Sequence, residues 1–448
     1  MINRMYFLRF YWLLILNFAL TFLTFAEAQF QDTTLTTTDS LLIVDRIVII
    51  GNEHTKPFVI QREMSLQPGT KITKQLLEYD QFRIYSLGLF NRVVITVIPT
   101  SEKKANLIVE VSERWYIFPF PVVGIKDRDW KKFYYGAGLL HSNFRGRNEK
   151  LYMIFVFGYD PSAEIWYNNP FLSEDGSYSL DAKIAYSKIQ NKSLIAQSGT
   201  NNFSEQHVYG SFGIGRRIGI HHSFWATLGY EYVKVSEYSV GRTLSSDGID
   251  RFPFANVSYT YDTRDLAEYP AQGSFVRLSI TKYGLLTKGI DVVRYATDFR
   301  QYLHLNSKLI LAGRLFTNNA AGGQTPSYNR VYFGYTERIR GHFKEVVEGE
   351  NLFGISSELH YQLFEPIFVQ LHFLPAEFSI LKFGAVAAIF ADAGTVWFRG
   401  QKFAIDRFAR GYGFGIHFLL PYSMVLRTDY ALNEIRRGEF IFDLGASF

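Results

Sequence analysis

Apolar and polar positions alternate along most of the chain, from Trp115 to Phe448. In residues 411–418, aromatic and aliphatic side chains alternate with glycines and His417. Residues 257–264 and 276–281 show the same alternation, with Ser, Thr, Asp and Arg at the polar positions. A period of two is that of a β-strand, whose successive side chains lie on opposite faces. One face is rich in aromatics and the other carries glycines and few charges, so the pattern indicates strands between lipid and a polar lumen.

The length of this region predicts the size of the sheet. Dividing residues 115–448 by roughly 20 residues per strand and connection gives about 16 strands. Backbone groups find no hydrogen-bond partners in lipid, so a sheet that crosses a membrane must close on itself. The sequence therefore predicts an all-β transmembrane barrel of about 16 antiparallel strands over residues 115–448.

Residues 41–114 have a mixed pattern that predicts a small α+β domain of order β-α-α-β-β. The expected elements are a strand over 41–50, a short helix that Thr55 caps and Pro57 begins, a helix over about 73–87, and strands around 93–97 and 107–111. About 75 residues suffice for an independent domain. A generic α+β domain would give the same pattern.

The N-terminus reads as a secretory signal over residues 1–28. Arg4 and Arg9 form a positive region, residues 11–25 an apolar one, and Ala26-Glu27-Ala28 a cleavage pattern. The alternative is a membrane anchor, but the apolar run is short and contains Asn17. The threonine-rich residues 29–40 are expected to be a polar leader.

Composition excludes several classes of function. The chain has no Cys, which removes disulfides, thiolate metal sites and cysteine nucleophiles. Its formal charge of +5 is dispersed, so nothing favours nucleic acid as a partner. The short motifs of lipases, zinc proteases and nucleotide-binding loops are missing, and the 10 His show no metal-ligand spacing. We expect neither catalytic residues nor a metal or other cofactor.

Several strings carry a resemblance to known families. Residues 41–114 resemble a POTRA domain, a periplasmic module, at Gly51-Asn52, Arg62-Glu63, Leu87-Gly88-Leu89-Phe90 and Glu113-Arg114. The rest resembles the BamA/TamA superfamily of outer-membrane assembly and translocation barrels. The matching strings are Tyr261-Asp262-Thr263-Arg264-Asp265, Ile339-Arg340-Gly341-His342, residues 390–397 with Asp392, and the C-terminal pattern Phe440, Phe442, Leu444 and Phe448, which is similar to a barrel sorting signal.

The resemblance implies a location and a set of roles. The barrel is expected in the outer membrane with the POTRA-like domain in the periplasm. Arg340 is expected to enter the lumen on a loop and meet Asp392 and, less directly, Glu358; the alternative is a solvated loop arginine. Asp262 and Arg264 are expected to form an ion pair on the lumen side of a strand. The first and last strands are expected to form a weak seam.

Two functions follow from the resemblance. The first is an insertase whose POTRA domain captures unfolded outer-membrane protein precursors by strand addition and whose seam inserts them into outer-membrane lipid. The alternative is a pore that secretes exported proteins, as in two-partner systems. Periplasmic or lipoprotein accessory subunits are possible partners for either. The sequence has room for one POTRA unit, fewer than either class usually carries.

Overall fold

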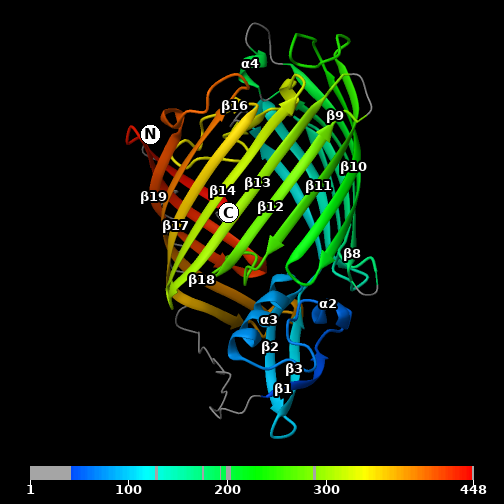
Figure 1. Ribbon diagram of the computed structural model, residues 1–448, viewed down its shortest axis with the longest axis vertical. Coiled ribbons are helices and arrows are strands. Elements are labelled where there is room, and N and C mark those ends of the chain that lie inside the picture. Colours follow the sequence, from blue (N-terminus) through cyan, green and yellow to red (C-terminus); the bar gives the residue numbers. More distant parts are fainter. Residues whose placement is uncertain are drawn as a thin grey trace.

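The computed structural model describes residues 42–126, 130–173, 176–191, 193–197, 203–285 and 289–445. The predicted signal segment, the predicted leader and Phe448 lie outside the described residues. Figure 1 shows a large barrel of tilted strands with a small domain, in blue, at one end. Within the described ranges, the structure contains no helix of the length and apolarity that crossing a membrane requires.

The small domain has the predicted order β-α-α-β-β. Its elements are β1 (Ile43–Ile50), α2 (Pro57–Gln61), α3 (Lys74–Ser86), β2 (Phe90–Pro99) and β3 (Lys104–Glu113). The sheet order is β1-β3-β2, with β1 parallel and β2 antiparallel to the central strand. The two helices cover one face of the sheet and share its apolar core, which includes Ile60, Leu77 and Ile84.

The starts of the two helices differ from each other in how they are capped. The Thr73 side chain accepts a hydrogen bond from the Leu76 N–H at the start of α3, as its sequence predicts. At α2, Pro57 is the first helical residue, but the predicted cap by Thr55 is wrong: the N-cap is Lys56, without a side-chain bond. Thr55 is instead buried against the barrel, where its hydroxyl accepts from Asn143 at 3.0 Å.

The barrel is one antiparallel sheet of 16 strands, which confirms the predicted fold and strand number. In sheet order its strands are β4 (Ile117–Ile125), β5 (Phe133–Phe144), β6 (Glu149–Gly158), β7 (Ser162–Asn169), β8 (Tyr178–Gln190), β9 (Ser204–Ile218), β10 (His222–Val235), β11 (Ile249–Asp262), β12 (Gly273–Tyr283), β13 (Val292–Asn306), β14 (Leu309–Gly322), β17 (Asn351–Gln370), β18 (Ile380–Trp397), β19 (Ala409–Leu420), β20 (Met424–Asn433) and β21 (Gly438–Leu444).

The remaining elements lie in connections. A two-stranded ladder pairs β15 (Val331–Phe333) with β16 (Val347–Gly349). The short helices are α4 (Leu194–Gln197), α5 (Ala376–Ser379) and the 3-10 turns η2 (Trp130–Lys132), η3 (Ser327–Asn329), η4 (Ile405–Arg407) and η5 (Pro421–Ser423).

The two faces of the strands differ as the alternation predicts. On β19, Phe414 is 62% exposed on the outer face, whereas His417 is 0% exposed on the inner face. Ile184, Leu228 and Ile389 are likewise exposed on other strands. A ring of exposed apolar side chains around a sheet suits a hydrocarbon environment, because the same surface in water would be an aggregation site.

The two ends of the sheet, β4 and β21, are not joined by a ladder in the ranges that the structure describes. The expectation that the sheet closes by hydrogen bonding is therefore not met there. The sequence of β4 gives a physical reason, because Pro119 and Pro121 remove two amide donors from a strand of nine residues. The opposite end, β21, has only seven residues.

Candidate functional site

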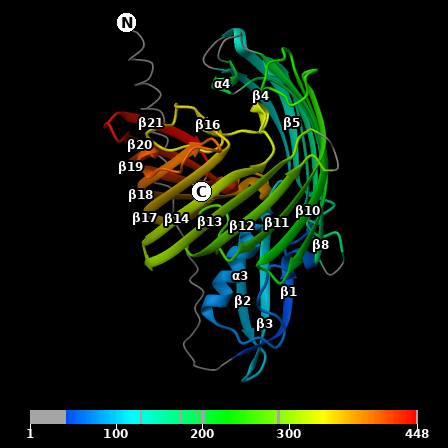
Figure 2. The ribbon, with the colours of Figure 1, turned by 45° about the horizontal axis from the view of Figure 1, so that its top comes forward.

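Residues 334–346 form a loop between β15 and β16 that lies against the inner wall of the barrel, near the β16 label in Figure 2. Ile339 is buried in an apolar cluster with barrel strands and β15. Arg340, the next residue, lies very close to β19. A Cβ atom at Gly411 would be 1.5 Å from the Arg340 carbonyl oxygen. Glycine at position 411 therefore makes room for the loop.

Arg340 meets Asp392 of β18 in a two-point contact. Its Nε and Nη2 donate to the two carboxylate oxygens at 2.7 Å each, and its backbone N–H donates to the same carboxylate at 3.2 Å. Asp392 pairs with Gly411 in the sheet, so the loop enters where the neighbouring strand has no side chain. Parallel N–H bonds from one guanidinium to one carboxylate set both distance and orientation.

Two further carboxylates face the same guanidinium. Nη1 of Arg340 lies 2.5 Å from Glu358 of β17 and 3.6 Å from Asp429 of β20. The ring of Phe390 stacks under the guanidinium, 3.6 Å from its carbon to the ring centre. We call Arg340, Glu358, Asp392 and Asp429 the Arg340 cluster. Its members are at most 5% exposed, so the loop is held to three strands by charges removed from water.

The residues after Arg340 continue the contact toward the last strands. Gly341 has a φ of +94°, a conformation that favours glycine, and its N–H donates to Glu439 at 2.8 Å. The N–H of Phe343 donates to the same carboxylate oxygen. The His342 ring contacts Glu434 at 2.8 Å. The loop is thus tied to the turn between β20 and β21 and to β21 itself.

The structure brings together the three residues that the resemblance paired, Arg340, Asp392 and Glu358. Sequence reasoning missed Asp429 and Glu439. The signal for Asp429 was available in the alternation of β20, where residues 427, 429 and 431 share the buried face. Nothing in the sequence indicated which of the inward-facing acidic side chains would contact the loop, because this contact depends on the register of strands that are distant in sequence.

The string Tyr261-Asp262-Thr263-Arg264-Asp265 lies where β11 ends, not within a strand. Arg264 donates twice to Asp262, at 2.9 Å each, but Arg264 is beyond the last strand residue, which corrects the expected ion pair on one strand face. Asp265 is buried and accepts from the N–H groups of Leu266 and Ala271 at 2.8 and 3.0 Å. This string therefore builds the turn from β11 to β12.

The C-terminal strand shows the alternation that the sequence predicts. Phe440, Phe442 and Leu444 are exposed on the outer face of β21, and Ile441 between them is buried. Phe448, the last residue of the proposed sorting signal, lies outside the described residues. The described part of the signal thus presents a row of apolar side chains at one end of the sheet.

Glu63 of the small domain joins that domain to the barrel. Its carboxylate accepts from Arg217 at the end of β9, with one contact at 2.8 Å, and from Arg83 of α3 at 2.5 Å. Burial raises the pKa of Glu63, but the hydrogen bonds and charges of Arg217 and Arg83 outweigh it and lower the pKa to about 2. The carboxylate is therefore ionised at any physiological pH.

Other contacts spread around the same mouth of the barrel. The Lys56 N–H donates to the carbonyl of Gly146 in the turn after β5 at 2.8 Å, and Asn91 donates to the carbonyl of Glu377 at 2.7 Å. Gly146 lies between β5 and β6, whereas Glu377 lies in α5, between β17 and β18. The small domain thus contacts two connections that are far apart in the sheet order, at the end of the barrel where Figures 1 and 2 show the domain.

Comparison with protein families identifies the two parts. The sequence model of the Omp85 superfamily domain matches residues 143–448. The chain belongs to the Omp85 superfamily. The POTRA family, described as a surface antigen variable number repeat, matches residues 42–114. Membership places this Omp85 protein in the outer membrane with its POTRA domain in the periplasm, among barrels that are not enzymes.

A curated relative is an assembly factor of the outer membrane. The outer membrane protein assembly factor BamA of Nitratidesulfovibrio vulgaris is 24% identical over 309 residues, which are 67% of this chain and 37% of that protein. The chain thus spans little more than a third of the length of this curated relative.

Solved structures share the fold. BamA from Haemophilus ducreyi lacking POTRA domains 1–3 gives a TM-score of 0.53 at 18% identity, over 90% of this chain and 84% of that one. CdiB from Escherichia coli gives 0.56 at 10% identity, over 90% and 75% of the two chains. Both matches extend over the POTRA domain and the barrel, and they bear on the architecture alone.

Proposed function

We propose that this Omp85 protein inserts outer-membrane proteins into the membrane at the seam between β4 and β21. The observation that carries the proposal is that, among the residues that the structure describes, no ladder joins the two end strands of an otherwise continuous sheet of 16 strands. An unpaired strand edge presents free N–H and C=O groups, which template the addition of a further strand. In lipid those groups have no other partner, so the edge favours an incoming client strand.

The residues of the two end strands support a seam that opens. Pro119 and Pro121 lower the number of hydrogen bonds that β4 can form, and proline in a sheet belongs on an edge. Phe440, Phe442 and Leu444 on the outer face of β21 are apolar and exposed, so lipid can remain in contact with this edge while a client pairs with it. Both features reduce the cost of opening relative to a fully bonded pair of strands.

The POTRA domain supplies a route to the seam. Its sheet order leaves β1 and β2 as edges, and Ile98 at the end of β2 is exposed. Such edges can bind an extended segment by strand addition. Because the domain contacts the rim at Arg217 and at Glu377, a segment bound to it lies beside the periplasmic mouth of the barrel.

The seam can be tested by locking it. The chain has no Cys, so one cysteine in Ile117–Ile125 and one in Gly438–Leu444, with the register scanned, give a single engineered disulfide. An insertase should lose activity when oxidised and regain it when reduced, measured as folding of a radiolabelled outer-membrane protein into proteoliposomes. Each single-cysteine variant is the matched control. Full activity of the locked protein would overturn the proposal.

A translocation pore is the second candidate, because the barrel also shares its fold with CdiB. A pore for an unfolded chain needs a free lumen. Here the Arg340 cluster binds the loop at 334–346 to the inner wall of the barrel. Transport through the lumen would therefore require the loop to detach from this wall and move out of the lumen. A seam lock would leave such a pore active, which makes the same experiment distinguish the two functions.

A further inference from the structure

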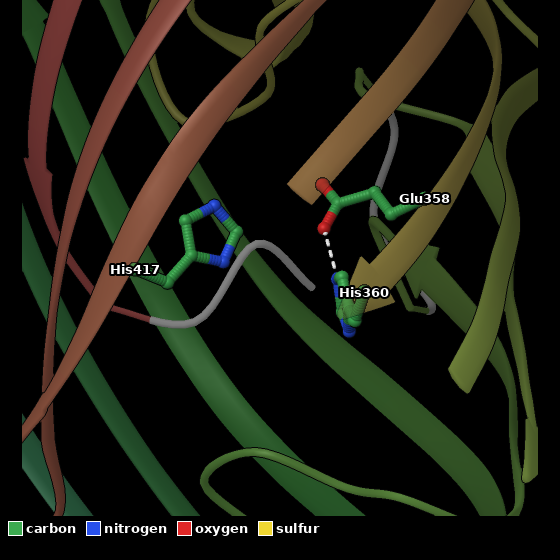
Figure 3. A group of neighbouring side chains, drawn as sticks. All are labelled: Glu358, His360 and His417. Atoms are coloured by element: carbon green, nitrogen blue, oxygen red, sulfur yellow. Dashed lines mark hydrogen bonds and ion pairs between the residues drawn. The ribbon is translucent and has the colours of Figure 1, made fainter. Parts of the chain in front are cut away.

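Glu358, His360 and His417 form a buried group on the inner wall of the barrel, next to the Arg340 cluster. Glu358 is 1%, His360 2% and His417 0% exposed. One ligand-type atom from each lies within 4.8 Å of the other two. Figure 3 shows the hydrogen bond between the Glu358 carboxylate and the His360 ring, with the His417 ring of β19 facing them.

We propose that this group binds a divalent transition-metal ion, Zn²⁺ being the best fit. Two imidazoles and one carboxylate are a donor set that zinc prefers, with a fourth position left for another oxygen. The proposal concerns the barrel wall alone and does not depend on whether the protein inserts or secretes its clients.

The sheet explains why the three side chains converge. Glu358 and His360 are two apart on β17 and therefore share a face. Across the sheet, His360 pairs with Ala388 of β18, which pairs with Gly415 of β19, two residues before His417. Because Ala388 and Gly415 are small, the rings of His360 and His417 come within 5.8 Å of each other, centre to centre.

The hydrogen bonds of the two histidines suit metal binding. His417 Nε2 lies 3.3 Å from Asp429, the arrangement in which a carboxylate orients a histidine that binds metal through its other nitrogen. That other nitrogen, Nδ1, lies 2.8 Å from the hydroxyl of Tyr269, which occupies the side where an ion would bind. The phenol oxygen can move aside or serve as the fourth ligand.

The hydrogen bond between His360 and Glu358 must change when a metal ion binds. The Nε2 of His360 lies 2.6 Å from Glu358, while Nδ1 is buried and, among the described residues, has no hydrogen-bond partner. Tetrahedral zinc sets its ligand atoms roughly 3.3 Å apart, so the contact with Glu358 must lengthen and His417 must approach by at most about 1.5 Å. Side-chain rotation on fixed strands covers such distances.

The charge of the surroundings favours a cation. The buried carboxylates of Glu358, Asp392 and Asp429 face two arginines, Arg340 and Arg427, with Arg427 3.7 Å from Asp429. The three carboxylates and the two guanidiniums together carry one net negative formal charge. Buried charge is costly unless it is compensated, and an ion between Glu358 and the histidines supplies positive charge at that point.

The test uses the folded full-length protein in detergent after treatment with EDTA. Titration with Co²⁺, a spectroscopic substitute for Zn²⁺, should give one equivalent of binding with the visible absorption of a tetrahedral site. His360→Ala and His417→Ala should each lower the affinity for Co²⁺ more than roughly 100-fold. Losing a residue that only hydrogen-bonds to a metal ligand lowers metal affinity roughly 10-fold to 100-fold. X-ray absorption of the zinc-loaded wild type should show two imidazole ligands, which decides the question even if a variant fails to fold.

His207→Ala is the matched control. His207 is a largely buried barrel histidine between Glu205 and Glu231, 3.3 and 3.2 Å away, but it has no second histidine beside it. This variant should bind Co²⁺ as the wild type does. Absence of binding by the wild type, unchanged binding by the two site variants, or an equal loss in the control would overturn the proposal.

Discussion

The guanidinium of Arg340 connects one loop to three strands of the barrel. Asp392 accepts two hydrogen bonds from it, and Glu358 and Asp429 complete its surroundings. Removing one partner of a buried pair leaves the other charges uncompensated, which typically costs ~3–5 kcal/mol. An exposed pair is worth less than ~1 kcal/mol, so the size of the effect distinguishes a structural latch from a solvated arginine.

We therefore expect Arg340→Ala to lower the thermal transition of the purified barrel clearly while the protein still reaches the outer membrane. Arg340→Lys should restore only part of the loss, because an ammonium lacks the planar fork that matches Asp392. Arg338→Ala is the matched control, since Arg338 lies on the same loop and is exposed. A silent Arg340→Ala would exclude the latch.

Coupling between the two residues provides a second measurement. Combining Arg340→Ala with Asp392→Asn should cost less than the sum of the single changes, because each change removes the other's partner. The readout is the free energy of unfolding in denaturant for the four proteins of the cycle. Strictly additive losses would mean that the contact between Arg340 and Asp392 contributes nothing to stability.

Glu63 gives a prediction about pH. Outweighing the effect of burial, Arg217 of the barrel, together with Arg83 of the same domain, lowers its pKa from 4.5 to about 2, so the share of the shift that Arg217 causes stabilises docking above pH 4.5 and is lost as the pH falls toward 2. The whole shift corresponds to about 3 kcal/mol at neutral pH, and docking contributes only the share that Arg217 causes. Glu63→Gln should weaken docking at pH 7 and remove its dependence on pH in that window, measured by energy transfer between dyes on the two domains.

The control for Glu63 is Glu110→Gln, which changes an exposed carboxylate on β3 of the same domain. It should leave both the docking and its pH dependence unchanged. If Glu63→Gln docks as tightly as the wild type at pH 7, the contact with Arg217 does not hold the two domains together.

At the scale of elements, the barrel strands pair only with one another, and the POTRA sheet is separate. The barrel should therefore fold without the POTRA domain. We expect a protein lacking residues 41–114 to insert into the outer membrane but to fail to restore growth or outer-membrane protein levels in a depleted strain. Glu63→Gln keeps the domain but weakens its docking. Comparing this variant with the truncated protein distinguishes the effect of losing the domain from the effect of losing its docked position. Full complementation by the truncated protein would contradict client capture by POTRA.

At the scale of the whole molecule, 16 strands hydrogen-bonded to their neighbours make a unit that resists detergent. The folded protein should migrate differently in detergent electrophoresis with and without boiling. A gel of membrane fractions measures this, with a sample unfolded in urea as the control. A protein that fractionates with soluble material and shows no shift would contradict the membrane barrel.

The sequence by itself determined those features that follow from local periodicity. The alternation at residues 411–418 placed Phe414 outside and His417 inside because a strand sends successive side chains to opposite faces. The order of the POTRA elements followed from the same kind of local signal, and the strand number followed from the length of residues 115–448. Local reasoning failed at Thr55. This residue is suited to capping α2, but its hydroxyl accepts a hydrogen bond from Asn143 of the barrel instead.

Only the tertiary structure decided which distant residues meet. Glu63 and Arg217 are 154 positions apart, and their contact depends on how a complete domain rests on a complete barrel. Asp429 faces Arg340, and His417 faces His360, because the register of β17 to β20 brings them level. Register is a property of paired strands, so a single strand's sequence predicts which face a side chain occupies but not the partner it finds there.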